Sequence, residues 1–506
     1  MISGTEIHVL DINAEFYGVP PINLMERAGT GVSDFIINTI NSKDKKKILL
    51  FAGLGNNGGD GFVAARKLSE KNDVTVFLTG EKKDIKTIIS KKNFQKLENK
   101  ETKIFDIKKI GIINSLIQEN EIIIDSMLGI GLTGDLREPY KKIVEKINKS
   151  KKTIISVDIP TGLGTKTAVI PNHTITFHDA KKGMNKKNCG SIKIVDIGIP
   201  KKAIEYVGPG ELKTYYPIPR KESHKGKNGR LLVVGGGPFY GAPALSSFAA
   251  QRTGIDLIFV ATPKKVARAI TSYSPLLIKP VRLTKNIAKL SPTLIVKELK
   301  NNDILIPEDI DLIKILSKKV DALLIGPGLG LDEKTKESVL KIVKLFNTQK
   351  KPIVIDADAI KIVGKHHDIL NNSKIILTPH IKEFKELTGE KLTTSLDNKK
   401  EKVLKWSKKL GVIIVLKGPT DIISDGSELK LNDVHNVAMT VGGTGDVLAG
   451  IIGGLVSKNI DIFNAARMGV FINGYAGNIA YDKRSYGLVA TDIIDEIPSV
   501  LKKFLR

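Results

Sequence analysis

The sequence predicts an α/β protein with two domains. Short β-branched runs alternate with amphipathic stretches along the chain, which is typical of helices packed on parallel sheets. The length of 506 residues exceeds that of one ordinary domain. A stretch rich in glycine and proline, residues 208–229, separates two sets of strands. We therefore expect one domain at residues 1–215 and another at residues 216–506.

The two sets of strands differ in motif, so they predict a fusion of unlike domains. In the first domain the expected strands are Lys47–Ala52, Val74–Leu78, Ile122–Asp125, Thr153–Val157 and Ser191–Ile194. In the second they are Arg230–Val234, Leu257–Ala261, Ala322–Ile325, Pro352–Asp356, Lys374–Leu377 and Val412–Leu416.

Composition excludes several classes of protein. Hydrophobic residues make up 41% and charged residues 26%, which excludes disorder along the whole chain. The net charge of +25 is spread without a basic tail, so we expect no nucleic-acid partner. The single cysteine, Cys189, indicates a reducing, cytoplasmic setting. No apolar run is long enough to span a bilayer, and Glu6 and Asp11 argue against a signal peptide, so we expect a soluble protein with no membrane partner.

The most polar glycine-rich stretch of the first domain is Gly53–Gly61, which follows a strand and precedes an expected helix at Phe62–Leu68. It contains G-x-G-x-x-G, but Asp73 precedes the next strand, whereas a dehydrogenase would need an acid at its end. A plain turn without a ligand is the alternative. The asparagines and the aspartate among the glycines favour a site, because backbone amides suit phosphate and side-chain oxygens suit a sugar or a hard cation.

Two later loops of this domain also carry acids at strand ends. Asp125 opens the loop 125–135, and Asp158 lies in Val157-Asp158-Ile159-Pro160-Thr161-Gly162. Either aspartate alone is explained by helix capping. Together with Asn57 they predict a polar, acidic pocket, because the carboxyl ends of parallel strands meet at one sheet edge.

In the second domain, Thr440-Val441-Gly442-Gly443-Thr444-Gly445-Asp446 precedes an apolar helix expected at Val447–Val456. Asp446 alone could be a cap. The glycines before it place backbone amides where phosphate charge would develop, so Asp446 is a candidate base for a hydroxyl that attacks a phosphoryl group. No Walker sequence G-x-x-x-x-G-K-[ST] occurs, so a nucleotide would be held differently.

Further loops follow strands of the second domain. Lys417 of Lys417-Gly418-Pro419-Thr420 places an ammonium where it could meet nucleotide phosphate. His380 is either structural or part of a substrate pocket. Asp356 and Asp358 are either turn residues or candidates for cation or phosphate binding. The other loops at strand ends are Gly235–Pro243 and Gly326–Gly330.

These motifs carry a family resemblance over nearly the whole chain. The second domain resembles ADP-dependent NAD(P)H-hydrate dehydratases of the ribokinase-like superfamily, through His224-Lys225-Gly226, Gly241-Ala242-Pro243, Gly326-Pro327-Gly328-Leu329-Gly330, Thr378-Pro379-His380, Lys417-Gly418-Pro419-Thr420 and Gly442-Gly443-Thr444-Gly445-Asp446. The first domain is similar to NAD(P)H-hydrate epimerases, through Leu24-Met25-Glu26-Arg27-Ala28-Gly29, Gly55-Asn56-Asn57-Gly58-Gly59-Asp60-Gly61, Leu136-Arg137-Glu138-Pro139-Tyr140 and Val157-Asp158-Ile159-Pro160.

The resemblance implies a Rossmann-like three-layer sandwich followed by a ribokinase-like α/β domain. It implies repair of the hydrated cofactors NADHX and NADPHX. The first domain would interconvert the R and S hydrates, and the second would dehydrate the S hydrate with ADP as co-substrate, giving AMP and phosphate. The alternative is an ATP-dependent vitamin or sugar kinase with a non-catalytic N-terminal binding domain.

The resemblance also assigns roles to residues. Asp158 and Asp446 would be the catalytic acid/base groups. Hydrate would contact Asn56, Asn57, Gly58, Gly59, Asp60, Gly129, Ile130, Gly131, Leu132, Thr133, Gly134, Asp135 and Asp158 in the first domain, and Ala242, Gly328, His380 and Asp446 in the second. Nucleotide would contact Lys417, Gly418, Pro419, Thr420, Gly443 and Gly445. Potassium would be held by Asn57, Asp125 and Thr161, magnesium would act in the dehydratase domain, and a homo-oligomer is expected.

Overall fold

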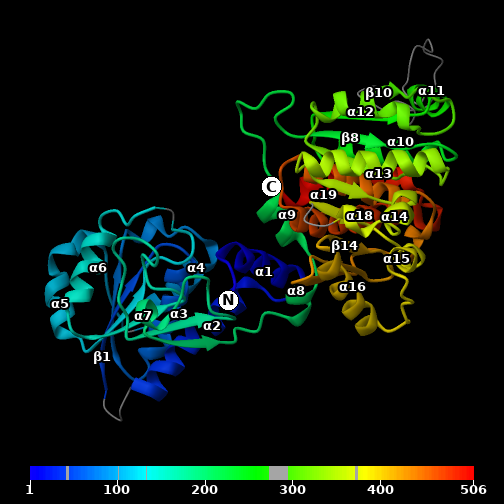
Figure 1. The fold of residues 1–506 in the computed structure, drawn as a ribbon. Coiled ribbons are helices and arrows are strands. Elements are labelled where there is room, and N and C mark those ends of the chain that lie inside the picture. Colours follow the sequence, from blue (N-terminus) through cyan, green and yellow to red (C-terminus); the bar gives the residue numbers. More distant parts are fainter. Residues whose placement is uncertain (41–44, 101, 133, 273–293, 371–373, 506) are drawn as a thin grey trace, which may run out of the picture. The chain divides into compact units, whose positions relative to one another are not determined.

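A computed structural model describes residues 1–40, 45–100, 102–132, 134–272, 294–370 and 374–505 (Figure 1). The chain divides into two compact units, Met1–Ile204 and Glu205–Arg506. Residues 205–215 pack with the second unit, where the Val207 amide donates to Leu431 and Glu211 pairs with the buried Arg467. A domain boundary near residue 215 stays a prediction. Across the described residues, no helix combines the length and apolar character needed to cross a membrane.

The first unit is built on a sheet in which all pairings of the described strands are parallel, in the order β3-β2-β1-β4-β5-β6-β7. The strands are β1 Lys47–Ala52, β2 Asp73–Leu78, β3 Lys103–Phe105, β4 Ile122–Ser126, β5 Thr153–Val157, β6 His173–Phe177 and β7 Ser191–Val195. The main helices are α1 Gly4–Phe16, α2 Pro21–Phe35, α3 Asn56–Leu68, α4 Ile88–Glu98, α5 Ile113–Glu119 and α6 Tyr140–Lys149, with short helices α7 Lys186–Cys189 and α8 Lys201–Glu205.

Both faces of the first sheet are covered, because alternate strand residues are apolar on each side. One core joins Ile48 and Leu50 of β1 to helices α1 to α4. The other joins Leu49 and Phe51 to α5 and α6. This arrangement confirms the expected three-layer sandwich.

The second unit holds a mixed sheet in the order β10-β9-β8-β11-β12-β13-β14-β15-β16, parallel up to β14 and antiparallel beyond it. The strands are β8 Arg230–Val234, β9 Leu257–Thr262, β10 Ile295–Glu298, β11 Ala322–Ile325, β12 Ile353–Ile355, β13 Ile375–Leu377, β14 Ile413–Leu416, β15 Asp421–Ser424 and β16 Leu429–Asn432. The helices are α9 Pro209–Tyr215, α10 Gly241–Arg252, α11 Lys264–Ser272, α12 Ile310–Ser317, α13 Glu333–Thr348, α14 Asp358–Val363, α15 Ile381–Thr388, α16 Leu396–Leu410, α17 Thr444–Ser457, α18 Ile462–Arg484 and α19 Ala490–Phe504.

Helices cover both faces of this sheet as well. The side chains of α12 to α16 pack with Leu232, Leu323 and Ile325 in one core. Helix α17 lies on the opposite face, where it packs on α10 and on strands β8 and β11. The expected α/β architecture is therefore confirmed for the second unit.

Some strands were missing from the sequence-based prediction. β3, β10, β15 and β16 are short, and none of them is a continuous β-branched run. β6 lies between β5 and β7 inside the sheet, although His173, Thr174 and Thr176 make it polar. Thr174 is tolerated there because its hydroxyl donates to the Cys189 carbonyl at 2.7 Å.

Candidate functional site

The polar loops of the first unit meet where the strand order reverses, between β1 and β4, which is where open α/β sheets bind ligands. The glycine-rich stretch is largely helical here: α3 begins at Asn56, whereas the sequence predicted a helix from Phe62. Its glycines permit close packing, because a Cβ at Gly58 would lie 1.9 Å from the Gly53 carbonyl oxygen. Asn57 to Asp60 are thus held on the first turns of a helix.

Asp125 is the fully buried centre of a hydrogen-bond network at the end of β4. Its Oδ1 accepts from the Thr161 hydroxyl at 2.6 Å, and its Oδ2 accepts from the Thr161 amide at 2.8 Å and the Ser156 hydroxyl at 2.9 Å. Burial raises the pKa of Asp125, although these hydrogen bonds oppose that effect. These hydrogen bonds join the end of β4 to β5 and to the loop after it.

Asn57 has a buried amide group whose Oδ1 and Nδ2 both lack a hydrogen-bond partner among the described residues. An unpaired buried amide costs free energy unless a ligand satisfies it. Gly129 packs directly over the Asn57 side chain, since a Cβ at Gly129 would lie 3.5 Å from Asn57 Cβ. The oxygens of Asn57, Asp125 and Thr161 have the chemistry that a hard cation requires.

Asp158 follows β5 and has a φ of 64°, the left-handed region that non-glycine residues rarely occupy. Its Oδ1 accepts from Lys181 Nζ at 2.5 Å and from the Thr176 hydroxyl at 3.4 Å. Among the described residues no hydrogen bond reaches Oδ2, and the side chain keeps 14% of its exposure. Asp158 therefore has one anchored oxygen and one that can meet a ligand.

Two further acids surround Asp158. The pKa of Asp60 is raised well above its usual range, first because its carboxyl group is removed from water and then because Asp158 and Asp11 add negative charge. The pKa of Asp11 of α1 is raised to about 6, first by loss of hydration at its carboxyl group and then by the charge of Asp158, while Lys181 opposes both. Carboxyl groups with different pKa values in one cluster are the usual basis of acid/base chemistry.

The structure adds Lys181, Thr176 and Asp11 to this cluster, which the sequence analysis did not identify. Thr176 and Lys181 belong to β6 and the turn after it, a strand that was not predicted. Asp11 lies on the first helix of the chain, far in sequence from any strand end. No local motif marked any of the three.

The loop after β4 is only partly described, since Thr133 lies outside the described residues. Ile130 lies against the start of α1, where a Cβ at Gly4 would contact its side chain. Gly131, Gly134 and Asp135 are exposed, and Asp135 Oδ1 accepts from the Lys166 amide at 3.3 Å. Their contact with a hydrate stays a prediction.

In the second unit, α17 begins at Thr444, whereas the sequence predicted a start at Val447. Gly443 precedes it with a φ of 93°, and no side chain caps the helix. The amides of the first turn therefore lack a side-chain acceptor, and the positive end of the helix dipole lies beside Asp446. This geometry suits a phosphate group.

Lys417 joins the loop after β14 to this helix start. Its Nζ lies 2.9 Å from Asp356 Oδ1 and 3.9 Å from Glu383 Oε2, and a Cβ at Gly445 would lie 3.3 Å from it. Asp356 also accepts from the Thr378 hydroxyl at 2.6 Å. Burial lowers the pKa of Lys417, but Asp356 and Glu383 outweigh that effect and raise it, so the ammonium stays charged.

Asp446 is a partly buried acid on the first turn of α17. Burial and then the charge of Asp356 raise its pKa to about 7, while Lys417 opposes them. Among the described residues no hydrogen bond reaches its carboxylate. A base with a pKa near neutrality and free oxygens is well suited to accept a proton from a substrate hydroxyl.

Of the expected pocket residues of the second unit, two lie side by side and a third caps a helix. Ala242 and Gly328 meet where the strand order reverses between β8 and β11, since a Cβ at Gly328 would lie 3.3 Å from Ala242 Cβ. His380 is half exposed and caps α15, with its Nδ1 accepting from the Lys382 and Glu383 amides. The cap explains His380 structurally, and hydrate contact stays a prediction.

The rest of the Lys417–Thr420 loop is held by its neighbours. The Gly418 amide donates to Asp421 Oδ1 at 3.1 Å, and the Pro419 carbonyl lies 3.1 Å from His435 Nε2. Burial raises the pKa of Asp421, opposed by His435. Pro419 is exposed and Thr420 partly exposed, so both remain accessible to a nucleotide.

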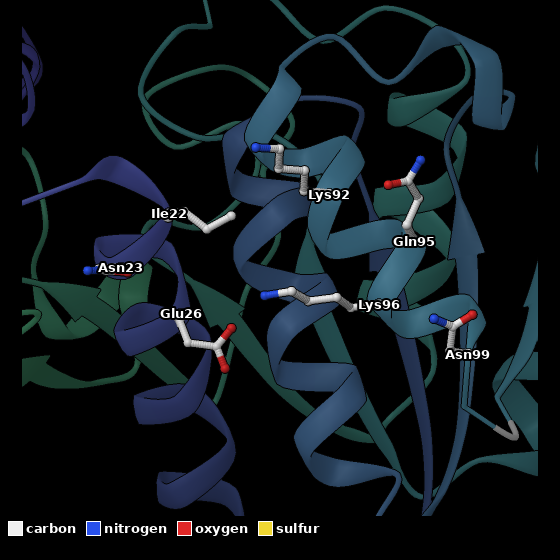
Figure 2. Close-up of a pocket in the computed structure, with 7 residues that line it drawn as sticks. All are labelled: Ile22, Asn23, Glu26, Lys92, Gln95, Lys96 and Asn99. Carbon is white, nitrogen blue, oxygen red and sulfur yellow. The ribbon is translucent and has the colours of Figure 1, made fainter.

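A separate cavity of about 620 Å³ lies between α2 and α4 of the first unit (Figure 2). Lys96 extends from α4 toward α2, which carries Glu26. Glu26 is already paired with Arg66 at 2.6 Å. None of the residues predicted for a site lines this cavity, which is bounded by Ile22, Asn23, Glu26, Lys92, Gln95, Lys96 and Asn99.

Comparison with known proteins finds two family models that match different parts of the chain. Residues 231–499 match the NAD(P)H-hydrate dehydratase family, and residues 21–183 match the family described as YjeF-related protein N-terminus. The bifunctional NAD(P)H-hydrate repair enzyme Nnr of Hyperthermus butylicus is 36% identical, over 99% of this chain and 92% of its own. The enzyme of the same name from Archaeoglobus fulgidus is 37% identical, over 99% and 98%.

A solved structure of a dehydratase also matches part of the chain. ADP/ATP-dependent NAD(P)H-hydrate dehydratase from Bacillus subtilis, co-crystallized with ATP and Mg²⁺, is 26% identical over 59% of this chain and 98% of that one, with a TM-score of 0.47.

Proposed function

Because the chain belongs to the family of bifunctional NAD(P)H-hydrate repair enzymes, we propose that it restores hydrated NADH and NADPH. The first unit epimerises the R and S hydrates. The second unit dehydrates the S hydrate with ADP, which yields NAD(P)H, AMP and phosphate. The observation that carries the second activity is the approach of Lys417 to Gly445 at the start of α17, beside Asp446 with its pKa of about 7.

Dehydration begins as a phosphoryl transfer. The hydroxyl on C6 of the hydrated ring attacks the β-phosphorus of ADP, Asp446 accepts the hydroxyl proton, and the bond to AMP breaks. The amides of Gly443 and Gly445 and the ammonium of Lys417 stabilise the charge on the transferred group. Loss of phosphate from C6 and of a proton from C5 then restores the ring double bond.

Ala242, Gly328 and His380 line the hydrate pocket, and Gly418, Pro419 and Thr420 contact the nucleotide.

Epimerisation needs acid/base chemistry at the same carbon. Asp158 is the acid/base group. It donates a proton to the C6 hydroxyl, and water leaves with the help of the ring nitrogen lone pair. Water then adds to the opposite face of the ring and returns a proton to Asp158. Asp158 Oδ2 can make this transfer, because no hydrogen bond from the residues that the structure describes reaches it. Asn56 to Asp60 and the loop 129–135 bind the hydrate.

The two units fit different cations. Potassium suits the oxygens of Asn57, Asp125 and Thr161, since the buried Asn57 Oδ1 has no hydrogen-bond partner in the part of the chain that the structure describes. The ion would fix the loops that hold the hydrate. Among the described residues no cluster of three or more acidic, histidine or cysteine side chains is arranged to hold a metal. Magnesium would therefore bind mainly through the ADP phosphates, with Asp356 or Asp358 as oxygen donors nearby.

The proposed activity is tested by incubating the chain with NADPH hydrate and ADP and following the absorbance of reduced nicotinamide. We expect recovery of NADPH and formation of AMP. Replacing ADP by ATP tests the donor, since activity with ATP alone would contradict the ADP assignment. No recovery with either nucleotide would overturn the dehydratase function. We also propose that the chain forms a homo-oligomer and acts in the cytoplasm, without nucleic-acid or membrane partners. Light scattering of the same preparation measures its molar mass and so tests the homo-oligomer.

A further inference from the structure

Lys181 is an ammonium group in an unusual position. Its side chain retains 5% of its exposure and lies beside the proposed epimerase acid, Asp158. Burying an ammonium costs roughly several kcal/mol unless hydrogen bonds and a counter-charge compensate for its lost hydration. A chain that needed only packing at this position would be served by an apolar residue of similar size.

All donor capacity of Lys181 is used. Nζ donates to Asp158 Oδ1 at 2.5 Å, to the Thr176 hydroxyl at 2.7 Å and to the Phe177 carbonyl at 2.8 Å. An ammonium has three protons, so this arrangement fixes its position completely. The backbone is held as well. Lys181 pairs with Ile2 in an isolated parallel β-bridge, and the Lys181 amide donates to Met184 Sδ at 3.2 Å.

The contact is confined to one oxygen of Asp158. Lys181 and Thr176 both approach Oδ1, and among the described residues none approaches Oδ2 with a hydrogen bond. The contrast with Asp125, whose two oxygens both accept hydrogen bonds, is clear. A carboxylate that is held through one oxygen has a fixed orientation, and its other oxygen stays available for proton transfer.

The charge of Lys181 also matters, because three carboxyl groups share this cluster. Asp158 is faced by Asp60 of α3 and Asp11 of α1, and both repel a negative charge on it. Lys181 is the cation that opposes this repulsion, lowering the pKa of both neighbours as well. Removing it would leave Asp158 with two acidic neighbours and a mobile side chain.

We propose that Lys181 is a positioning residue of the epimerase site, which fixes the Asp158 carboxyl group through Oδ1 while Oδ2 exchanges protons with the hydrate. The proposal rests on the epimerase function proposed above. Lys181 itself touches no reacting atom. It therefore acts through Asp158, and this defines the test.

The test is a double-mutant cycle with Lys181→Met and Asp158→Asn, in the full chain. The R hydrate of NADPH is supplied alone, without ADP, and the two epimers are separated by chromatography at early times against a buffer blank. We expect Lys181→Met to lower kcat by about 10- to 100-fold with little change in KM, as for other outer partners of a catalytic group. In the Asp158→Asn background, where the acid is already gone, Lys181→Met should cause no further loss.

Additive losses in the cycle would overturn the proposal, since Lys181 would then act independently of Asp158. A rise in KM with kcat unchanged would also overturn it. Lys46→Met is the matched control, because it removes an ammonium that pairs with Glu121 at 2.8 Å on the surface of the same unit, and it should leave epimerisation unchanged. If wild-type protein fails to convert the R hydrate, the epimerase function itself is wrong, and this outcome is separate from an additive cycle.

Folding is checked by thermal unfolding of each variant. Should Lys181→Met fail to fold, Thr176→Val gives the same information, because it deletes the hydroxyl that contacts both Lys181 Nζ and Asp158 Oδ1. We expect a smaller loss of kcat with KM unchanged. Unchanged kcat in a folded Thr176→Val protein would contradict the proposed support of Asp158. Lys181→Arg, which keeps the charge but not the three-acceptor geometry, should recover part of the activity lost in Lys181→Met.

Discussion

At the scale of single residues, the environment of Asp446 destabilises the fold and suits its proposed role as a base. Its carboxyl group is largely removed from water and faces Asp356 and Glu383, which together raise its pKa to about 7. A carboxylate with an ordinary pKa would be a much weaker base toward a hydroxyl group. The same environment penalises its ionised form in the folded protein.

The rate of dehydration should depend on pH through Asp446. As a base it must be ionised, so kcat for the S hydrate should fall about tenfold per pH unit below a pH of about 7. Initial rates with saturating ADP, measured between about pH 8 and pH 5, test this dependence. A constant kcat across that range would show that Asp446 is not the titrating base.

Stability should depend on the same group. Its folded pKa lies above the unfolded value of 3.8, so between these values the folded state binds more protons and the free energy of unfolding falls as pH rises. The loss is complete above about pH 7 and is at most about 4 kcal/mol. Asp446→Asn should therefore raise the melting temperature at pH 8 and change it little near pH 4. An unchanged or lower melting temperature at pH 8 would contradict the buried charge.

At the scale of elements, the start of α17 is the part of the second unit that we propose to bind nucleotide. Helix α17 carries no side-chain cap, and it follows Gly443 with a left-handed backbone. Helix α3 of the first unit plays a similar part, since it carries Asn57 and Asp60 on its first turns. In both units an uncapped helix start lies beside acids from strand ends.

Substitution of Gly445 should weaken nucleotide binding. A Cβ there would lie 3.3 Å from Lys417 Nζ, so Gly445→Ala should displace the ammonium and occupy the space in front of the helix amides. We expect KM for ADP to rise roughly tenfold, which corresponds to ~1.4 kcal/mol. Gly442→Ala is the matched control, because nothing lies within 4 Å of a Cβ at Gly442. Equal effects of the two variants would remove Lys417 and Gly445 from the nucleotide site.

At the scale of the whole molecule, each unit has its own sheet and its own hydrophobic core. The two proposed reactions use different residues and a substrate that diffuses between sites.

The two activities should therefore be separable by mutation. Asp158→Asn should strongly reduce enzymatic conversion of the R hydrate, to a low residual rate, and leave ADP-dependent dehydration of the S hydrate unchanged. Asp446→Asn should do the reverse, with ADP binding retained in calorimetry. Loss of both activities in either single variant would show that the sites are coupled, and so would contradict independent units.

Much of this organisation was predictable from local sequence. Buried parallel strands such as Lys47–Ala52 and Ala322–Ile325 are apolar along their length, and the ends of parallel strands must lie at one edge, so Asp125, Asp158 and Lys417 could be identified as strand-end residues. The starts of α3 and α17 were predicted too late, because glycine has a poor helix propensity and tertiary packing overrode it at Gly58 and Gly445.

The sequence by itself determined the α/β class, the two unlike domains and the family. Only the tertiary structure placed Asp11 and Lys181, which lie 170 residues apart in the chain, beside one carboxylate. It also decided that Asp158 is anchored through a single oxygen and that the pKa of Asp446 is about 7. Local patterns encode helices and strands, whereas burial and the charge of neighbours depend on which distant segments meet.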